Sequence, residues 1–303
     1  MTNAPSNANV NSLFALQGYP PQILAIDTDE KSARIIASNL DGVLDGVQID
    51  QPGNSIYWTN MGSRPNTGEK FFDRDGTIER CDLDGSNHAV LVKKGQIVTP
   101  KQLQLDADNG LLYFCDREGM AVMRCRTDGS ELTVLLHTGR WPNESADDLR
   151  HCVGIALDRL NGYVYWTQKG SPDAGLGRIF RMQLDMPHNA TAETRQDVEL
   201  LIDRLPEPID LEIDHERHHL YWTDRGNLEG GNSVNRAAIT PDGLMDHVVL
   251  AIGLQEGIGL AINKAERKVY VGDLSGRIYR VPFNGGSLKE IYRCPGIVTG
   301  LAF

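Results

Sequence analysis

Short apolar segments separated by polar turns recur along the whole chain. The clearest are tetrads of aromatic and β-branched residues that end in an acid, an amide or a similar polar residue: "YWTN" (57–60), "YFCD" (113–116), "YWTQ" (165–168), "YWTD" (221–224) and "YVGD" (270–273). Alternation of this kind is typical of a β-strand with one face buried more deeply than the other. The tetrads recur about every 53 residues, a period that indicates one repeated structural unit.

Each repeat shows the same order of segments. An apolar segment such as "LEID", ending at Asp214, precedes the tetrad, and a segment of the form G-x-I-x-R, such as "GRIYR" from Gly276, follows it. A fourth apolar segment, such as "LTVLLH" from Leu132, completes the repeat. Four short antiparallel strands cannot bury both faces of their sheet alone, but sheets stacked around an axis cover one another. The pattern therefore predicts an all-β propeller.

The two ends of the chain predict how the ring closes. Residues 298–303, "VTGLAF", match only the first strand of a repeat. Residues 12–18, 21–27 and 32–38 match a second, a third and a fourth strand. We therefore predict six four-stranded blades, the last of them closed by strands from both termini. Residues 1–303 are expected to form a single domain, with residues 1–11 disordered.

Composition and charge narrow the choice of partners and compartment. The 303 residues carry a formal net charge of −11 and show no cluster of Lys and Arg, which argues against a nucleic-acid partner. No apolar run is long enough to cross a membrane. The polar start "MTNAPSNANVNS" does not resemble a secretory signal, and the five cysteines form no C-x-x-C pair. We expect a cytoplasmic protein with reduced thiols and no membrane partner.

Several of these motifs resemble one known family. The tetrads at Tyr57, Tyr165 and Tyr221, with the turns "DLDGS" at Asp82 and "RTDGS" at Arg126, resemble the YWTD six-bladed β-propellers of low-density-lipoprotein-receptor-type proteins. The resemblance covers essentially the whole chain. It implies the fold more than the function, because propellers host unrelated activities. The cysteine-rich modules that accompany receptor propellers do not appear in this sequence, so a receptor role is not favoured.

Functional residues are expected where the repeats differ, because long loops on a rigid frame usually carry binding groups. The loop "NMGSRPNTGEKFFDRDG" and the connection "HTGRWPNESADDLRHC" are the longest irregular segments at one end of the predicted propeller. They bring to that end Met61, Arg64, Phe71, Phe72, Trp141, Arg150 and His151. We predict that this loop-rich mouth binds an apolar small molecule, with a protein partner at the same face as the alternative.

The starts of the six first strands give a second set of candidates. Alignment places Gly46, Gln102, Gly154, Asp210, Gly259 and Gly300 in one ring, preceded by Asp45, Lys101, Val153, Ile209, Ile258 and Thr299. The glycines indicate either crowding near the axis or an open channel. The polar members Lys101, Gln102, Asp210 and Thr299, with His151, Glu207 and Glu256 nearby, are predicted to converge on one cavity. Alternatively, they are solvated loop groups or paired ions.

The sequence contains no recognised motif for nucleophilic, metal-dependent or nucleotide-dependent catalysis in the structural context that such a motif requires. We find no nucleophile elbow, phosphate-binding loop, H-E-x-x-H sequence or dinucleotide fingerprint. The segment "HERHH" (215–219) falls in a turn at the end opposite the variable loops. We predict no metal and no cofactor. A calcium-dependent hydrolase of the lactonase type stays open as an alternative, with Asp45, Asp210, Glu207 and Glu256 as its carboxylates.

As an unaccompanied propeller the chain is also similar to the fungal hetero-Diels-Alderases of tropolonic sesquiterpene biosynthesis. This resemblance implies a cofactor-free reaction in which a tropolone quinone methide adds to a humulene-type alkene. Holding two reactants together contributes up to about 7–11 kcal/mol in good cases, and an acid or base helps to generate the diene. We expect His151, Lys101 and Asp210 to handle the proton. A protein-interaction propeller without catalytic activity is the main alternative.

Overall fold

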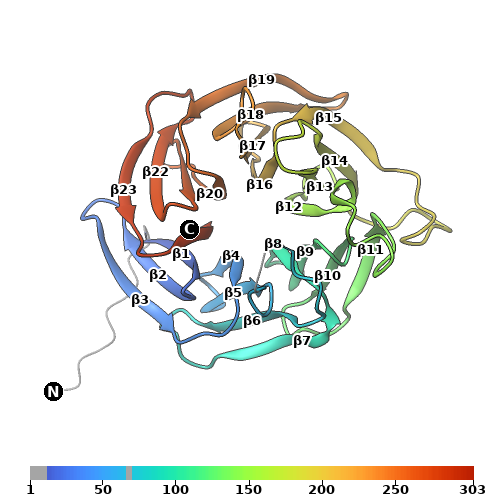
Figure 1. Ribbon diagram of the computed structural model, residues 1–303, viewed down its shortest axis with the longest axis horizontal. Helices are drawn as coiled ribbons and strands as arrows, with labels where there is room; N and C mark the ends of the chain where they lie inside the picture. Colours follow the sequence, from blue (N-terminus) through green and yellow to red (C-terminus); the bar gives the residue numbers. More distant parts are fainter. Residues whose placement is uncertain (1–11, 66–69) are drawn as a thin grey trace.

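The computed structural model describes residues 12–65 and 70–303, which form six four-stranded antiparallel sheets around a central axis (Figure 1). The prediction of an all-β six-bladed propeller is confirmed. The expectation of disorder in residues 1–11 lies outside the described residues. Within the described part of the chain, no helix is long and apolar enough to span a membrane.

Each blade runs from an inner first strand to an outer fourth strand. Blade 1 consists of β4 (Leu44–Asp50), β5 (Ser55–Asn60), β6 (Gly76–Asp82) and β7 (Ala89–Ile97), and blade 2 of β8 (Pro100–Asp106), β9 (Leu111–Asp116), β10 (Ala121–Arg126) and β11 (Thr133–His137). Blade 3 consists of β12 (Cys152–Asp158), β13 (Tyr163–Gln168), β14 (Gly177–Gln183) and β15 (Glu199–Leu205), and blade 4 of β16 (Pro208–Asp214), β17 (His219–Asp224), β18 (Ser233–Thr240) and β19 (Gly243–Ile252). Blade 5 consists of β20 (Gly257–Asn263), β21 (Lys268–Asp273), β22 (Arg277–Pro282) and β23 (Lys289–Arg293), and blade 6 of β24 (Ile297–Ala302), β1 (Ser12–Tyr19), β2 (Gln22–Asp27) and β3 (Ser32–Ser38).

The sixth blade joins the two ends of the chain, as predicted. Strand β24 pairs antiparallel with β1, with Phe14 opposite Ala302 and Leu16 opposite Gly300. Figure 1 shows the carboxyl end of β24 inside the ring beside β1. Because no other first strand is available to this blade, the ring closes only when both ends of the chain are in place.

The tetrads form the core and join neighbouring blades. The side chains of Trp58, Trp166 and Trp222 are almost completely buried between sheets. The third tetrad residue bridges two blades: Thr167 Oγ1 donates to the carbonyl oxygen of Ile209 in the next blade at 2.8 Å. Thr167 Oγ1 also accepts the N–H of Gly154, in its own blade, at 2.7 Å. The tetrads are therefore architectural, as their repetition indicates.

Glycines at the starts of the first strands allow those strands to approach closely. A Cβ atom on Gly46 would lie 2.7 Å from Gln102 Cα, and one on Gly259 would lie 2.8 Å from Gly300 Cα. Real Cβ atoms do not approach backbone this closely. Crowding between adjacent first strands therefore explains these two glycines.

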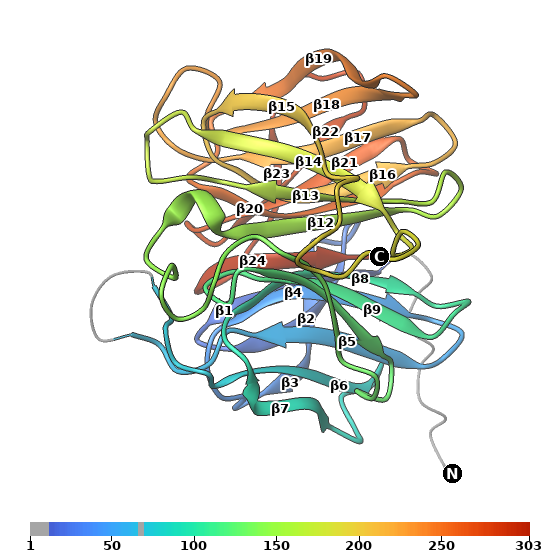
Figure 2. The same cartoon turned by 90° about the vertical axis from the view of Figure 1, so that its right-hand side faces the viewer.

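The two long connections lie at the same end of the propeller. Residues 61–65 and 70–75 join β5 to β6, and residues 138–151 join β11 to β12 and contain the short 3₁₀ helix η1 (Asp148–Arg150). Both are at the left in Figure 2, the end where the first strands begin. The predicted placement of these loops at one end is confirmed.

Candidate functional site

A cavity of about 290 Å³ opens at this end of the propeller, near the axis. We call it the mouth cavity. Its lining residues are Tyr19, Val43, Asp45, Met61, Arg64, Pro65, Phe71, Lys101, Arg117, Arg225, Ile258, Leu274, Ile297 and Thr299. The volume is close to the lower limit of roughly 300 Å³ that is common for small-molecule sites.

Two rings of equivalent positions build most of this cavity. The first is the predicted ring at the starts of the first strands, which contributes Asp45, Lys101, Ile258 and Thr299. The second consists of the residue that directly follows each tetrad, or its counterpart in blade 6, and contributes Tyr19, Met61, Arg117, Arg225 and Leu274. Repetition of the blade therefore brings residues that vary between repeats to one place.

Chemical character divides the second ring into two halves. Blades 2, 3 and 4 carry the cations Arg117, Lys169 and Arg225 at this position. Blades 5, 6 and 1 carry Leu274, Tyr19 and Met61. Lys169 is buried and is not among the residues that line the cavity. The second ring thus gives the cavity a cationic side and a largely apolar side, on which the guanidinium of Arg64 lies 4.5 Å from the ring centre of Tyr19.

Lys101 and Asp45 form a buried ion pair in the cavity wall. Lys101 Nζ also lies 3.3 Å from Met61 Sδ, and Gln102 Nε2 donates to the second oxygen of Asp45 at 3.1 Å. Burial raises the pKa of Asp45 and lowers the pKa of Lys101. These opposite shifts reduce the free-energy cost of moving a proton from the ammonium to the carboxylate.

Glu118 positions both Arg117 and the long loop of blade 1. Arg117 donates to its two carboxylate oxygens at 2.8 and 2.7 Å, and the Glu118 side chain is fully buried. Glu118 Oε1 accepts the N–H of Phe71 at 3.4 Å, and Thr99 Oγ1 donates to the carbonyl oxygen of Phe71 at 2.7 Å. Phe71 is thereby held next to Arg117, whose guanidinium lies 5.9 Å from the centre of its ring.

Glu207 and Glu256 form ion pairs with the cations of the second ring and do not line the cavity themselves. Glu207 accepts Arg225 Nε at 3.0 Å and pairs with Lys169 at 3.5 Å. Glu256 lies 3.3 Å from the same guanidinium. Burial and the charge of Arg225 lower the pKa of Lys169. Both predicted glutamates therefore belong to the ion pairs behind the cationic side.

Asp210 and Gln102 lie near the mouth cavity but do not line it. The two oxygens of Asp210 accept the N–H groups of Leu211 at 2.9 Å and Leu260 at 2.8 Å, so the side chain joins blades 4 and 5. Burial raises its pKa well above the usual range. Gln102 donates to the carbonyl oxygen of Thr299 at 3.1 Å as well as to Asp45.

His151 is buried beneath the connection between blades 2 and 3. Its Nε2 lies 2.8 Å from the carbonyl oxygen of Ser145, and its Nδ1 lies 3.6 Å from Asp148. Burial lowers the pKa of this imidazole. His151 does not line the mouth cavity, and its contacts anchor the 138–150 segment.

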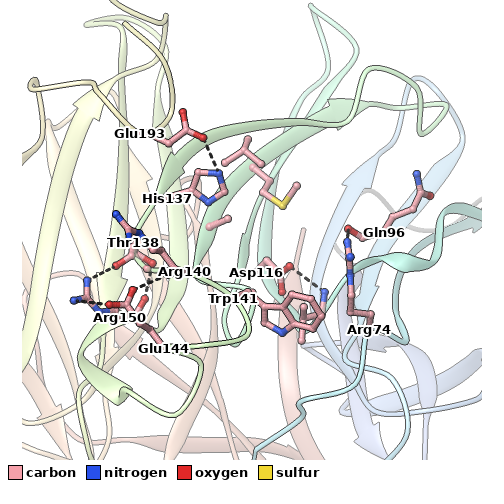
Figure 3. Close-up of a pocket in the computed structure, with 16 residues that line it drawn as sticks. Arg74, Gln96, Asp116, His137, Thr138, Arg140, Trp141, Glu144, Arg150 and Glu193 are labelled. Carbon is pink, nitrogen blue, oxygen red and sulfur yellow. Dashed lines mark hydrogen bonds and ion pairs between the residues drawn. The ribbon is translucent and has the colours of Figure 1, made fainter.

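Trp141 and Arg150 line a different cavity, of about 810 Å³, at the edge of blade 2 (Figure 3). Trp141 is 38% exposed, and the guanidinium of Arg74 lies 5.0 Å from its ring centre. Phe72 is exposed and lines neither cavity. The two long loops meet at this second cavity, the groove at blade 2: Arg74 of the first loop contacts Trp141 of the second, and Lys70 pairs with Asp148 at 2.8 Å. In contrast to the expectation from the sequence, however, the predicted residues divide between two cavities. Phe71, Met61 and Arg64 belong to the mouth cavity and Trp141 to the groove at blade 2.

The sequence interpretation missed Tyr19, Arg117, Arg225 and Leu274. Arg117 is the second residue of "DREG", the short segment that follows Cys115. The signal was the position directly after each tetrad, which the same alignment of repeats could have compared across blades.

Potential metal ligands in the described part of the chain are not grouped for metal binding. No set of three or more His, Cys, Asp and Glu side chains among those residues could hold a metal ion. The carboxylates that a calcium site would use have other partners: Asp45 pairs with Lys101, Glu207 and Glu256 with Arg225, and Asp210 with backbone N–H groups. The five cysteines, all in described segments, are free and buried.

Comparison with known proteins defines the class of this chain. No family model matches it. The chain is 40% identical over 292 residues to "Low-density lipoprotein receptor-related protein 1" of Pyricularia oryzae, with 93% of this chain and 91% of the relative covered. With its six-bladed fold and YWTD tetrads, the chain belongs to the family of YWTD-type β-propellers of the low-density-lipoprotein-receptor class.

Other similarities extend over part of a relative or show the fold alone. The chain is 39% identical over 270 residues to "3-hydroxyacyl-CoA dehydrogenase-like protein LAM1" of Cochliobolus heterostrophus; 85% of this chain is covered, but it spans only 55% of that relative. A structure of a nidogen/laminin complex matches with a TM-score of 0.72 at 18% identity, covering 96% of this chain and 97% of the other. A gluconolactonase of Xanthomonas campestris matches with a TM-score of 0.62 at 14% identity, covering 96% and 88%.

Proposed function

We propose that the mouth cavity binds a small organic molecule that has an apolar body and an anionic or strongly accepting oxygen, and that the protein promotes its reaction without a cofactor. The division of the cavity into a cationic side with Arg117 and Arg225 and an apolar side with Met61 and Leu274 carries this proposal. Buried cations bind oxygen anions through charge-assisted hydrogen bonds, which are stronger than neutral ones.

The particular reaction we propose is the hetero-Diels-Alder addition of a tropolone quinone methide to a humulene-type alkene. The oxygens of a tropolone ring suit the cationic side, and a hydrocarbon suits the apolar side. The protein contributes mainly by holding the two reactants in contact. Of the three residues predicted to handle a proton, Lys101 is the one that lines the cavity, and Asp45 is its proton acceptor.

The experiment is an assay of the purified protein with a quinone methide precursor and humulene, analysed by chiral chromatography and mass spectrometry. We expect faster formation of the adduct and enrichment of one enantiomer, and the activity should persist with a chelator present. Arg117→Gln should raise KM, because it removes a cation that holds the oxygen. A racemic product formed at the rate seen without protein contradicts the proposed reaction.

A second candidate is a protein-interaction propeller, which the receptor-type name of the Pyricularia relative supports. In this case an acidic peptide side chain would occupy the cationic side of the mouth cavity. Failure of the assay together with loss of a protein partner on Arg117→Gln substitution would favour this candidate. The lactonase-type alternative gains no comparable support, because its four candidate carboxylates have separate partners.

A further inference from the structure

We propose that Lys101 forms an imine with an aldehyde or ketone bound in the mouth cavity. This inference rests on the proposed small-molecule site and adds a chemical class of substrate to it, namely carbonyl compounds. It gives Lys101 a covalent role in addition to proton transfer.

The position of Lys101 combines features that make an amine nucleophilic. Its side chain is 9% exposed, yet it lines the cavity and is within reach of a bound molecule. Lysines become nucleophiles when burial or a neighbouring cation disfavours the ammonium form. Both conditions hold here, because burial and, to a smaller extent, the charge of Arg117 lower the pKa of Lys101 against the opposing charge of Asp45.

Asp45 supplies the proton acceptor that imine formation requires. The carboxylate is in direct contact with Lys101 Nζ and is almost completely buried. It takes one proton from the ammonium, and the free amine attacks the carbonyl carbon to give a carbinolamine. Asp45 then returns the proton to the hydroxyl, which leaves as water while the C=N bond forms. One proton of the attacking nitrogen moves to the carbonyl oxygen in the carbinolamine, so loss of water leaves a protonated imine beside the regenerated Asp45 carboxylate. The overall change is ammonium plus carbonyl to protonated imine plus water, without an oxidant or reductant.

Arg117 and Arg225 favour carbonyl compounds that also carry an anionic group. Both guanidinium groups line the same cavity as Lys101. A flat aromatic aldehyde with a carboxylate can place the carboxylate near these cations and its ring against the apolar side. We therefore choose 4-carboxybenzaldehyde as the probe, and 4-methylbenzoate as its analogue without a carbonyl group.

Lys169 provides a matched comparison within the same molecule. It is also buried, with a side chain 8% exposed, and its pKa is also lowered. Its Nζ pairs with Glu207 and lies outside the residues that line the mouth cavity. If burial and a lowered pKa alone made a lysine reactive, Lys169 would therefore react as readily as Lys101. Labelling of Lys101 without labelling of Lys169 would show that access to the mouth cavity is what makes Lys101 react.

The experiment traps the imine in the intact protein. The protein is incubated with 4-carboxybenzaldehyde, treated with borohydride to reduce any imine to a stable amine, digested, and mapped by mass spectrometry. We expect one carboxybenzyl group on Lys101 and none on Lys169, and prior addition of 4-methylbenzoate should reduce the labelling. Binding of 4-methylbenzoate is measured separately by ligand-observed NMR.

The outcomes separate this inference from the proposed function. Binding of 4-methylbenzoate without labelling of Lys101, or labelling spread equally over Lys101, Lys169 and surface lysines, overturns the imine and leaves the binding site intact. Absence of both binding and labelling contradicts the imine and the anion-accepting cavity together.

Two variants test the assigned roles. Asp45→Asn should slow labelling by on the order of 10²-fold, because it removes the proton acceptor. Lys101→Arg should abolish labelling while keeping a cation opposite Asp45, with folding checked by circular dichroism. Undiminished labelling in folded Asp45→Asn protein contradicts the role of Asp45. The labelling map of the unmodified chain does not depend on either variant folding.

Discussion

The hydroxyl of Thr223 donates a 2.8 Å hydrogen bond to the carbonyl oxygen of Ile258, which lies in the next blade. The same hydroxyl oxygen accepts the N–H of Asp210, in its own blade, at 3.2 Å. Thr59 and Thr167 make the equivalent pair of contacts at two other blade boundaries. One buried hydroxyl thus satisfies a backbone donor and a backbone acceptor that face each other across a boundary.

Replacing Thr223 with Val should destabilise the protein by about 1–3 kcal/mol, because it leaves these two buried backbone groups without a partner. Valine has nearly the same shape, so packing changes little. Urea unfolding measures the free-energy difference. Thr133→Val is the control, since that exposed hydroxyl donates only to Glu131 within its own turn. Equal stability of the two variants contradicts the bridging role.

Deleting residues 298–303 should abolish cooperative unfolding. The deletion removes most of β24, so blade 6 loses its first strand and β1 loses one of its two partners. The buried residues Val298 and Leu301 leave the core with it. Thermal unfolding followed by circular dichroism measures the effect. A truncated protein that melts as sharply and at the same temperature as the full chain refutes closure by this strand.

The repeat made most of the fold predictable, because equivalent strands carry equivalent side chains. The same alignment identified Lys101, Asp45 and Thr299 as neighbours around the axis, although they are far apart in the sequence. The alignment could not show that the carboxylate of Asp210 accepts N–H groups from two blades, because the pattern of side chains does not encode a hydrogen bond to the backbone of the next blade.

Loop geometry was less predictable. Placing Trp141 and Phe71 at one end of the propeller was correct, but that end is wide enough to hold two cavities. Trp141 lies toward the edge of blade 2 beside Arg74, whereas Phe71 is held near the axis by Thr99. Irregular segments lack the strand register that made the ring positions comparable.

Substitution of Phe71 should weaken binding of 4-methylbenzoate at the mouth cavity. Phe71→Ala removes an aromatic ring from the cavity wall, and an anchor of this kind contributes on the order of 2 kcal/mol, or about 30-fold in Kd. Trp141→Ala should have no such effect, because Trp141 lines the other cavity. Isothermal titration calorimetry measures both. Loss of affinity in the Trp141 variant alone would move the site to the groove at blade 2.

Asp224 makes the free energy of unfolding depend on pH. Its carboxylate is 1% exposed, accepts the N–H of Glu207 at 2.5 Å, and lies 3.4 Å from Trp222 Nε1. Burial raises its pKa to about 8. In the unfolded chain the same group has a pKa of about 3.9. Between these values the folded protein binds one proton more than the unfolded chain does, so the free energy of unfolding falls as the pH rises.

The comparison of the unmodified protein with Asp224→Asn isolates this term, because asparagine does not titrate. The free energy of unfolding of the unmodified protein relative to the variant should fall from pH 4 to pH 8, by at most about 1.4 kcal/mol per unit, and become constant above that range. Urea unfolding at a series of pH values measures it. Asp128→Asn is the control: hydrogen bonds from Ser130 lower the pKa of that exposed carboxyl, so its small contribution is lost only on acidification. A difference between the unmodified protein and Asp224→Asn that is flat or grows with pH would show that Asp224 is ionised in the folded protein.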